Sequence, residues 1–469
     1  MWQVIKNEWI SWFRNRALVG ISLGFVLILV MTIILGNLQT HEQNHSHQTA
    51  KEHMRSQWEN NEEMHPHGAA HYGTYVFKPA NLLSSLDEGV NSVTGNVLRV
   101  EGHVQNEIIY SEASQMQATS KFGKLKSSLL LQYIVPLLLI FLAYQSVNSE
   151  KQSGRLKLLV LQGTDPRKII IAKTLSVTLY GIGLLGLTVL VYSIINLKTL
   201  NSEILARTLI LFFSYSIYYF ILSAITVFFS ARWKNTNLAL TTMLGAWILW
   251  TIFLPNIMMS SVESWHPLPF RKDFKSAMKE DRSEGIDGHN PSDQRRKDLE
   301  QEVLAEYGVD SLSQLPIDFG GIVMQADEEY GNMVWDKHFG GLQKILTQQK
   351  KSYQLGGILN PFISLQNLSM GLTASDNFHH QEFLLQVESY RRVFIKTLND
   401  EHAYGIKNPE DDYLKVGADF YKSIADFEYK PVAISSVLSN YMVDILLLTL
   451  WGLLALMLLL FGTKKIQVL

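Results

Sequence analysis

The chain has 469 residues, of which 47% are hydrophobic and 18% are charged, and its formal net charge is −2. The near-neutral charge and the lack of a long basic face argue against nucleic acid as a partner. The sequence contains no cysteine, which excludes disulfides, thiolate chemistry and cysteine-ligated zinc. The apolar residues are concentrated in long uncharged runs, so the sequence predicts a polytopic α-helical membrane protein with six spans.

Residues 1–16 are predicted to form an amphipathic helix. Trp2, Ile5, Trp9 and Trp12 recur at helical spacing. Tryptophans on one face favour the headgroup region, so we expect an interfacial elbow helix on the cytoplasmic side. Residues 17–36 carry no charge and form the first predicted span. A signal peptide is the weaker interpretation, because no small-residue cleavage site follows this run.

Two polar insertions separate the spans. The first, residues 37–126, begins with a tract rich in His, Gln, Asn and Glu that we expect to be helical or loosely ordered, and its mixed pattern further on suggests a small α+β fold. The second, residues 261–435, shows helical periodicity in several stretches and is expected to be mostly helical. Those stretches are residues 294–307, 319–353, 378–399 and 410–424.

The remaining five spans are predicted at residues 128–147, 174–196, 207–230, 237–260 and 441–462. Residues 148–173, between the second and third spans, contain six Lys and Arg residues and two acids. Short basic loops stay in the cytoplasm, so both termini are expected there and both insertions outside. Within this loop, the apolar segment between Gly154 and Gly163 is typical of a helix that lies along the inner membrane surface and presents one face to a soluble partner.

Enzyme signatures of the usual kinds are absent from the sequence. It has no G-x-x-x-x-G-K-[ST] loop, no H-E-x-x-H and no G-x-S-x-G. The chain is therefore not expected to be an enzyme, and it has no P-loop with which to bind ATP phosphates itself.

The span layout, the elbow helix and the basic loop resemble a permease subunit of the ABC-2 type. The insertions narrow this resemblance to bacterial ABC permeases that carry a domain of unknown function between their last two spans. The motifs that carry it are HPHGAAHYGTYVFKP at 65–79, VEGHVQN at 100–106, HPLPFR at 266–271 and NPFISLQNLSMGLTASD at 360–376.

The resemblance implies a transporter with two permease and two ATPase subunits in the bacterial inner membrane. The separate cytoplasmic ATPase would bind ATP and Mg²⁺, and the second permease copy is expected to make a homodimer. Membrane lipids would surround the spans, the insertions would be periplasmic, and a periplasmic or outer-membrane protein is a further expected partner. The expected ATPase-coupling residues are Glu150, Gly154, Arg155, Leu158, Leu159, Gly163, Thr164 and Lys173.

Five residues in or near the spans are candidates for a substrate path. Gln132 and Asn256 could line it, although such residues more often satisfy helix–helix hydrogen bonds. Pro136 and Pro255 are either flex points or tolerated kinks. Asp444 is an acid inside the sixth span, which makes it a functional candidate, but its depth would let it reach the interface.

The first insertion also contains candidate metal ligands. His65, His67, His71 and His103, with Glu101, could bind Zn²⁺ or Cu²⁺ through neutral imidazole. The neighbouring proline and glycines indicate a loop. The alternative is that these histidines cap turns, because no thiolate or dense acid cluster supports a metal. A membrane-anchored metal-binding protein or scaffold is therefore the alternative function.

One charged group in the second insertion is interpreted as structural. Glu388 lies three and four residues before Arg391 and Arg392 on a predicted helix. This spacing is typical of a surface ion pair.

Overall fold

A computed structural model of the protein describes residues 1–106, 125–233, 235–405 and 414–462. In these ranges, six helices are long and apolar enough to cross a membrane, which confirms the predicted polytopic helical class. They are Arg16–Glu59, Ser127–Gln152, Pro166–Ile195, Ser202–Arg232, Thr236–Trp265 and Met442–Phe461.

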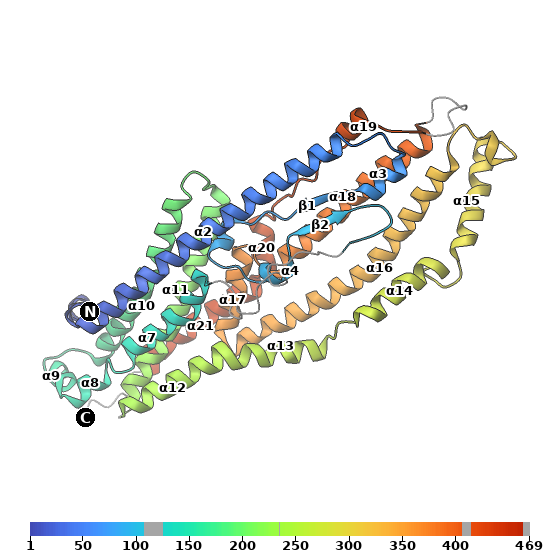
Figure 1. The fold of residues 1–469 in the computed structure, drawn as a ribbon. Helices are drawn as coiled ribbons and strands as arrows, with labels where there is room; N and C mark the ends of the chain where they lie inside the picture. Colours follow the sequence, from blue (N-terminus) through green and yellow to red (C-terminus); the bar gives the residue numbers. More distant parts are fainter. Residues whose placement is uncertain (107–124, 234, 406–413, 463–469) are drawn as a thin grey trace.

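The molecule is elongated (Figure 1). One end carries the elbow helix α1 (Trp2–Arg14) together with α8 (Asn148–Gln152) and α9 (Arg155–Leu161), and we call it the basic-loop end. The opposite end, the domain end, carries α15 (Ser292–Tyr307) and α19 (Ala418–Ser423).

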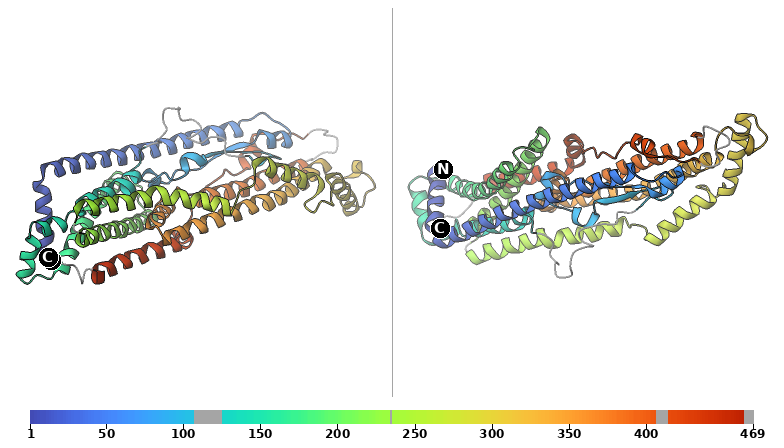
Figure 2. Two further views of the ribbon diagram at one scale, coloured as in Figure 1. Left: turned by 90° about the horizontal axis from the view of Figure 1, so that it is seen from below. Right: turned by 45° about the horizontal axis from the view of Figure 1, so that its top comes forward.

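The elbow between α1 and α2 (Arg16–Glu59) is made by one residue. Asn15 has an extended backbone that ends α1, and its side chain accepts the Leu18 N–H at 3.2 Å, which caps α2. As a result, α1 lies across the line of α2 (Figure 2).

The spans form a bundle with α11 (Ser202–Arg232) at its centre, where Tyr215, Tyr218 and Tyr219 are fully buried. Around it pack α7 (Val135–Ala143), α10 (Pro166–Ile195) and α21 (Met442–Phe461). The fifth span is the least buried of the six, and the first and sixth spans are only slightly more buried. It consists of α12 (Thr236–Ile248), the π-helical turn η3 (Leu249–Phe253) and α13 (Leu254–Trp265).

The expected irregularity at Pro136 takes a specific form. A short helix, α6 (Ser127–Leu129), is followed by the π-helical turn η2 (Leu130–Ile134), and Pro136 then sits in the first turn of α7. The helix nevertheless continues from Ser127 through η2 into α7, so Pro136 lies inside it and supplies no backbone N–H to the preceding turn. The π-helical turn is the local irregularity before the proline, and the Leu131 carbonyl within it accepts a hydrogen bond from Tyr219 at 2.8 Å.

The first insertion begins as a continuation of the first span. Helix α2 runs without a break to Glu59, so the His-rich tract is helical. The α+β part contains α3 (Pro66–Tyr72), η1 (Leu82–Ser85) and α4 (Asn91–Thr94). Its two strands, β1 (Thr74–Phe77) and β2 (Val97–Val100), pair antiparallel, with Thr74 opposite Val100.

The second insertion is mostly helical, as predicted. Its elements are α14 (Arg271–Glu284), α15, η4 (Leu312–Gln314), α16 (Phe319–Leu355), η5 (Gly356–Ile358), α17 (Pro361–Leu372), α18 (Asn377–Tyr404), α19 and α20 (Ile434–Asn440). The helix expected over 410–424 is wrong in extent. Residues 410–413 of it lie outside the described residues, and in the rest only Ala418–Ser423 is helical.

The two insertions share one hydrophobic core. Trp58 of α2, Val76 of β1 and Val100 of β2 belong to the same buried cluster as Phe383 and Phe394 of α18. Figure 1 shows the small sheet lying along α18. We call this unit the composite domain. The small sheet therefore depends on the second insertion, because it needs α18 to cover its apolar face.

Part of the second insertion enters the membrane bundle. The apolar helix α17 packs against α11 and α21. At its start, Asn360 donates to the backbone carbonyl of Trp250 at 2.7 Å, and Trp451 of α21 donates to that of Gly357 at 2.9 Å. The placement of all of residues 261–435 outside the bundle is therefore wrong. The turn between α16 and α17 forms a re-entrant hairpin that reaches the middle of two spans.

Candidate functional site

At the basic-loop end, α8 and α9 form a tight turn that we call the basic hairpin, residues 148–163. Gly154 and Gly163 bracket α9 with φ values of +73° and +87°. No atom would meet a Cβ at either position, so the left-handed backbone alone requires glycine there. After the hairpin, the Thr164 N–H donates to the Leu159 carbonyl at 3.1 Å and closes the end of α9.

The outer face of α9 exposes leucine to solvent. Leu158 is 59% exposed and Leu161 is 74% exposed, whereas Leu156 is buried and Leu159 packs against the bundle core. Exposed basic side chains surround the leucine pair, namely Arg155, Lys157, Arg167 and Lys168. An apolar patch with a polar rim is typical of a protein-docking surface. Of the predicted coupling pair, only Leu158 faces outward, and Leu161 was missed because sequence alone does not fix the buried face of a two-turn helix.

Lys173 holds the hairpin from behind. It is 1% exposed, and its Nζ donates to Glu150 of α8 at 2.9 Å and to Glu8 of α1. One buried ammonium thus joins the elbow helix, the hairpin and α10. Lys173 and Glu150 were expected among the ATPase contacts, but the structure places Lys173 behind the exposed face, where it positions that face.

Three of the five substrate-path candidates line one groove. Gln132, Pro255 and Asn256 border a cavity of about 630 Å³ between the second and fifth spans. Gln132 donates to Asp87 at 3.1 Å and to Tyr215 at 2.9 Å, so it also satisfies bonds within the protein. The groove therefore combines a polar wall with the poorly buried fifth span.

The other two candidates lie elsewhere. Pro136 is buried at the start of α7. Asp444 is fully buried, and its carboxylate accepts hydrogen bonds from Asn367 at 2.9 Å and from Gln354 at 2.6 Å. The expectation that Asp444 reaches the interface is wrong, because both of its partners come from the re-entrant hairpin. Asp444 fastens that hairpin to the sixth span.

Three of the candidate metal ligands come together in the composite domain. Residues 66–72 form the helix α3 and not the expected loop, which places His67 and His71 one turn apart with their Nε2 atoms separated by 3.2 Å. His103 reaches them from the turn after β2. One ligand atom from each of these three histidines lies within 4.8 Å of the other two.

The remaining two metal candidates have other contacts. His65 caps α3 by accepting the His67 N–H at 3.2 Å, and its ring lies 4.2 Å from that of His402. Glu101 pairs with Arg99 at 2.9 Å. For His65 and Glu101, these contacts fit a structural role better than a role as metal ligands.

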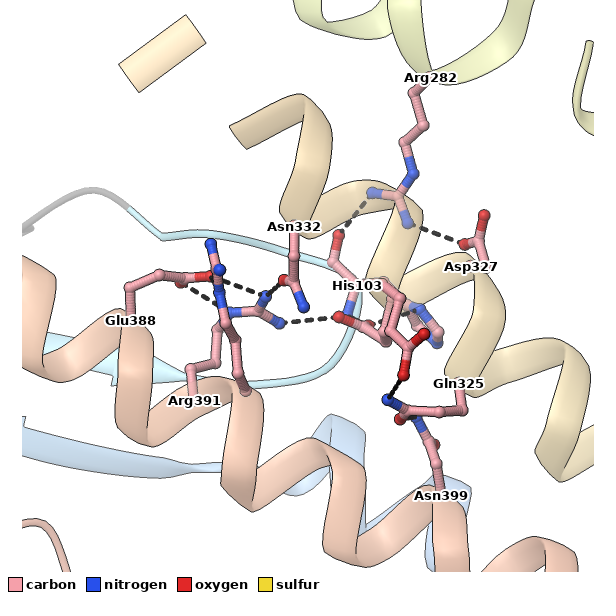
Figure 3. A network of polar contacts seen from close by, with 11 residues as sticks. His103, Arg282, Gln325, Asp327, Asn332, Glu388, Arg391 and Asn399 are labelled. Carbon is pink, nitrogen blue, oxygen red and sulfur yellow. Dashed lines mark hydrogen bonds and ion pairs between the residues drawn. The ribbon is translucent and has the colours of Figure 1, made fainter. Parts of the chain in front are cut away.

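A buried polar network lies beside the histidines (Figure 3). Arg391 donates to Glu328 at 2.8 Å, to Glu388 at 2.9 Å and to Asn332 at 2.5 Å. Both Arg391 and Glu328 are 3% exposed, so the interpretation of Arg391 and Glu388 as a surface pair is wrong. Burial by itself raises the pKa of Glu328, but hydrogen bonds from His103 and Arg391 and the charge of Arg391 outweigh it and lower that pKa to about 2.

The fold and the two ends of the molecule define a multi-pass membrane protein with one large domain. Residues 64–271 match the family model described as ABC-2 family transporter protein, and residues 272–430 match a domain of unknown function, DUF3526. Comparison with curated proteins and with solved structures found no match.

The matched domains lie where the resemblance placed them, with DUF3526 between the fifth and sixth spans. The chain therefore belongs to the ABC-2 type transporter permeases that carry this domain, and the predicted family is confirmed. Membership identifies it as a membrane subunit of an ABC transporter, a class that works with an ATPase subunit.

Proposed function

We propose that this chain couples ATP hydrolysis by a separate cytoplasmic ATPase to movement of a substrate, or of a bound partner protein, at the domain end. The observation that carries the proposal is the exposed Leu158 and Leu161 pair on a hairpin held by the buried Lys173. An exposed leucine pair on a braced helix fits insertion into a groove of a soluble partner.

The charge distribution supports an orientation with the basic hairpin in the cytoplasm. Arg155, Lys157, Arg167 and Lys168 lie around it, and short loops of this kind are retained inside. Both termini would then be cytoplasmic, and the composite domain would be periplasmic, in the bacterial inner membrane.

The hairpin is joined to the bundle by direct contacts. The backbone N–H of Asn148 donates to Ser230 Oγ of α11 at 3.3 Å, and its side chain donates to the Trp233 carbonyl at 3.0 Å. Closure of an ATPase pair beneath the hairpin would therefore move α7 and α11 together. This is how the chain would receive force.

The proposed assembly is a homodimer of this chain with two ATPase subunits. The fifth span exposes a row of large apolar residues, including Ile248, Leu249, Ile252 and Phe253. A second copy against this face would close the groove lined by Gln132 and Asn256, with lipid covering the other spans. An amphiphilic substrate fits a groove that has one polar and one apolar wall.

The test is affinity purification of the tagged chain from its native membrane, followed by mass spectrometry. We expect a P-loop ATPase in equal amount with wild type and little or none with L158E/L161E. The matched control is L312E, which places the same charge on an exposed leucine of the composite domain. The proposal fails if no ATPase is recovered with wild type, or if L158E/L161E recovers as much as L312E does. A passive scaffold would recover only proteins bound at the domain end.

A further inference from the structure

Three imidazoles from two separate segments converge at one point of the composite domain. The ring centroid of His103 lies 5.4 Å from that of His67 and 5.3 Å from that of His71. Zn–N bonds of about 2.0–2.1 Å place two imidazole nitrogens roughly 3.3 Å apart around a tetrahedral ion. The observed 3.2 Å between the His67 and His71 Nε2 atoms matches this spacing.

His103 is held in place on three sides. Its backbone N–H donates to the Glu328 carboxylate, its Nδ1 lies 3.0 Å from the same carboxylate, and its carbonyl accepts from Arg282 at 3.1 Å. Its φ of +63° is uncommon outside glycine. Such strain persists only where surrounding contacts enforce it. With Nδ1 engaged by Glu328, Nε2 is the nitrogen of His103 left for a ligand.

Glu328 resembles the outer partner of a metal-bound histidine. In protein metal sites, a ligating histidine commonly donates its second ring N–H to a carboxylate, which fixes the tautomer and the ring orientation. Glu328 makes this contact with His103 from α16, and Arg391 anchors the carboxylate at 2.8 Å. The Glu328–Arg391 pair therefore serves as a rigid support for His103.

A hydrogen bond between His67 and His71 without a metal would also give a separation of 3.2 Å. Such a bond gives no role to His103, whose backbone is strained and whose imidazole is oriented by Glu328. We propose that His67, His71 and His103 bind one divalent transition-metal ion of the Zn²⁺ or Cu²⁺ class, with Glu328 orienting His103. The exposed side of His71 would leave a fourth coordination position open to solvent.

The proposed site would join the two insertions. His67 and His71 lie on α3 of the first insertion, whereas His103 is fastened to Glu328 and Arg282 of the second. An ion bound by all three side chains would crosslink the composite domain without a disulfide, in a chain that has no cysteine.

The test measures metal content directly and does not depend on the ATPase. Full-length protein in detergent is stripped with chelator, dialysed against Zn²⁺ or Cu²⁺ at low micromolar concentration, and analysed by elemental mass spectrometry. We expect one ion per chain for wild type and a loss of at least 100-fold in affinity for H71A, whose side chain is exposed and whose loss leaves the core intact. E328Q is expected to weaken binding by about 10–100-fold.

The matched control is H45A, which removes an exposed histidine from the polar tract of α2. H45A should bind as wild type does, and bound metal should raise the melting temperature of wild type and H45A but not of H71A. The proposal is overturned if wild type retains no ion of either metal, or if H71A binds as tightly as wild type. Loss of the ion in H45A alone would assign binding to the α2 tract and would equally overturn it.

Discussion

Replacing Arg391 with methionine should destabilise the composite domain by about 3–4 kcal/mol at pH 7. Methionine keeps much of the side-chain length but leaves the buried Glu328 carboxylate without its guanidinium, whereas Glu388 keeps its ion pair with Arg392 at 3.0 Å. Removing one partner of a buried ion pair costs about 3–5 kcal/mol. The remaining contact of Glu328 with His103 places the expected value in the lower half of that range.

The lowered pKa of Glu328 gives the expected pH dependence of this loss. Burial opposes ionisation, but His103 and Arg391 lower the pKa from 4.5 to about 2. Because the folded pKa is below the unfolded one, the ionised carboxylate contributes stability above about pH 4.5, and this contribution is lost as the pH falls towards 2. The difference corresponds to about 3 kcal/mol. The gap between wild type and R391M should therefore narrow in acid.

The assay is thermal unfolding of the detergent-purified chain at pH 7. R391M should lower the midpoint of the domain transition by roughly 10 °C. R392M is the matched control, because Arg392 is the next residue on α18, is 31% exposed, makes two hydrogen bonds to the exposed Asp336 and leaves Glu388 with Arg391 as its remaining cation. Its expected cost is below about 1 kcal/mol. The reasoning is refuted if R391M has the same melting temperature as wild type, or if R392M lowers the melting temperature as much as R391M does.

Two further predictions concern the basic hairpin. K173M removes the cation shared by Glu8 and Glu150 and should lower stability by about 2 kcal/mol, since both carboxylates keep some solvent contact. Recovery of the ATPase should drop, and protease cleavage after α1 should increase. If neither changes, Lys173 does not hold the hairpin in place. G154A forces alanine into a backbone with φ +73° and should cost about 1–2 kcal/mol. The loss of stability should appear as faster hydrogen exchange over residues 148–163. G186A is the control: Gly186 has open space around it in α10, so alanine there should leave exchange over residues 148–163 unchanged.

The spans were predictable because each is a long apolar run with at most one charged residue, a signal that no tertiary contact overrides in lipid. The re-entrant hairpin was not predictable in the same way. Helix α17 has 12 residues, too few to cross the membrane, and its apolar composition also fits a buried helix of a soluble domain. Its packing against α11 and α21, and the hydrogen bonds of the preceding turn with Trp250 and Trp451, distinguish the two.

The candidate sites show the same limit. The spacing of Glu388 and Arg391 is identical in a surface pair and in a buried network, and the residue that decides between them, Glu328, lies on another helix. His67, His71 and His103 were all candidates from the sequence, but only the fold separated them from Glu101 and His65. Spacing within one element can be read from sequence, whereas convergence between elements requires the packing.

Helix α11 joins the basic hairpin to the base of the composite domain. At the basic-loop end, Ser230 accepts from the hairpin backbone. At the other end of α11, the buried Arg207 donates to the backbone carbonyls of Leu372, at the end of the re-entrant hairpin, and of Val432, just before α20. A helix of 31 residues is about 46 Å long and does not compress.

Because α11 is bonded at both ends, displacement of the basic hairpin by an ATPase would shift Leu372 and the composite domain as one movement. Asp444 adds a second attachment, since it bonds to both arms of the re-entrant hairpin. Force applied at the hairpin would therefore reach the domain without passing through the groove between the second and fifth spans. Within the proposed function, this arrangement favours mechanical action on whatever the domain binds, with the groove as a separate proposed route for an amphiphilic substrate.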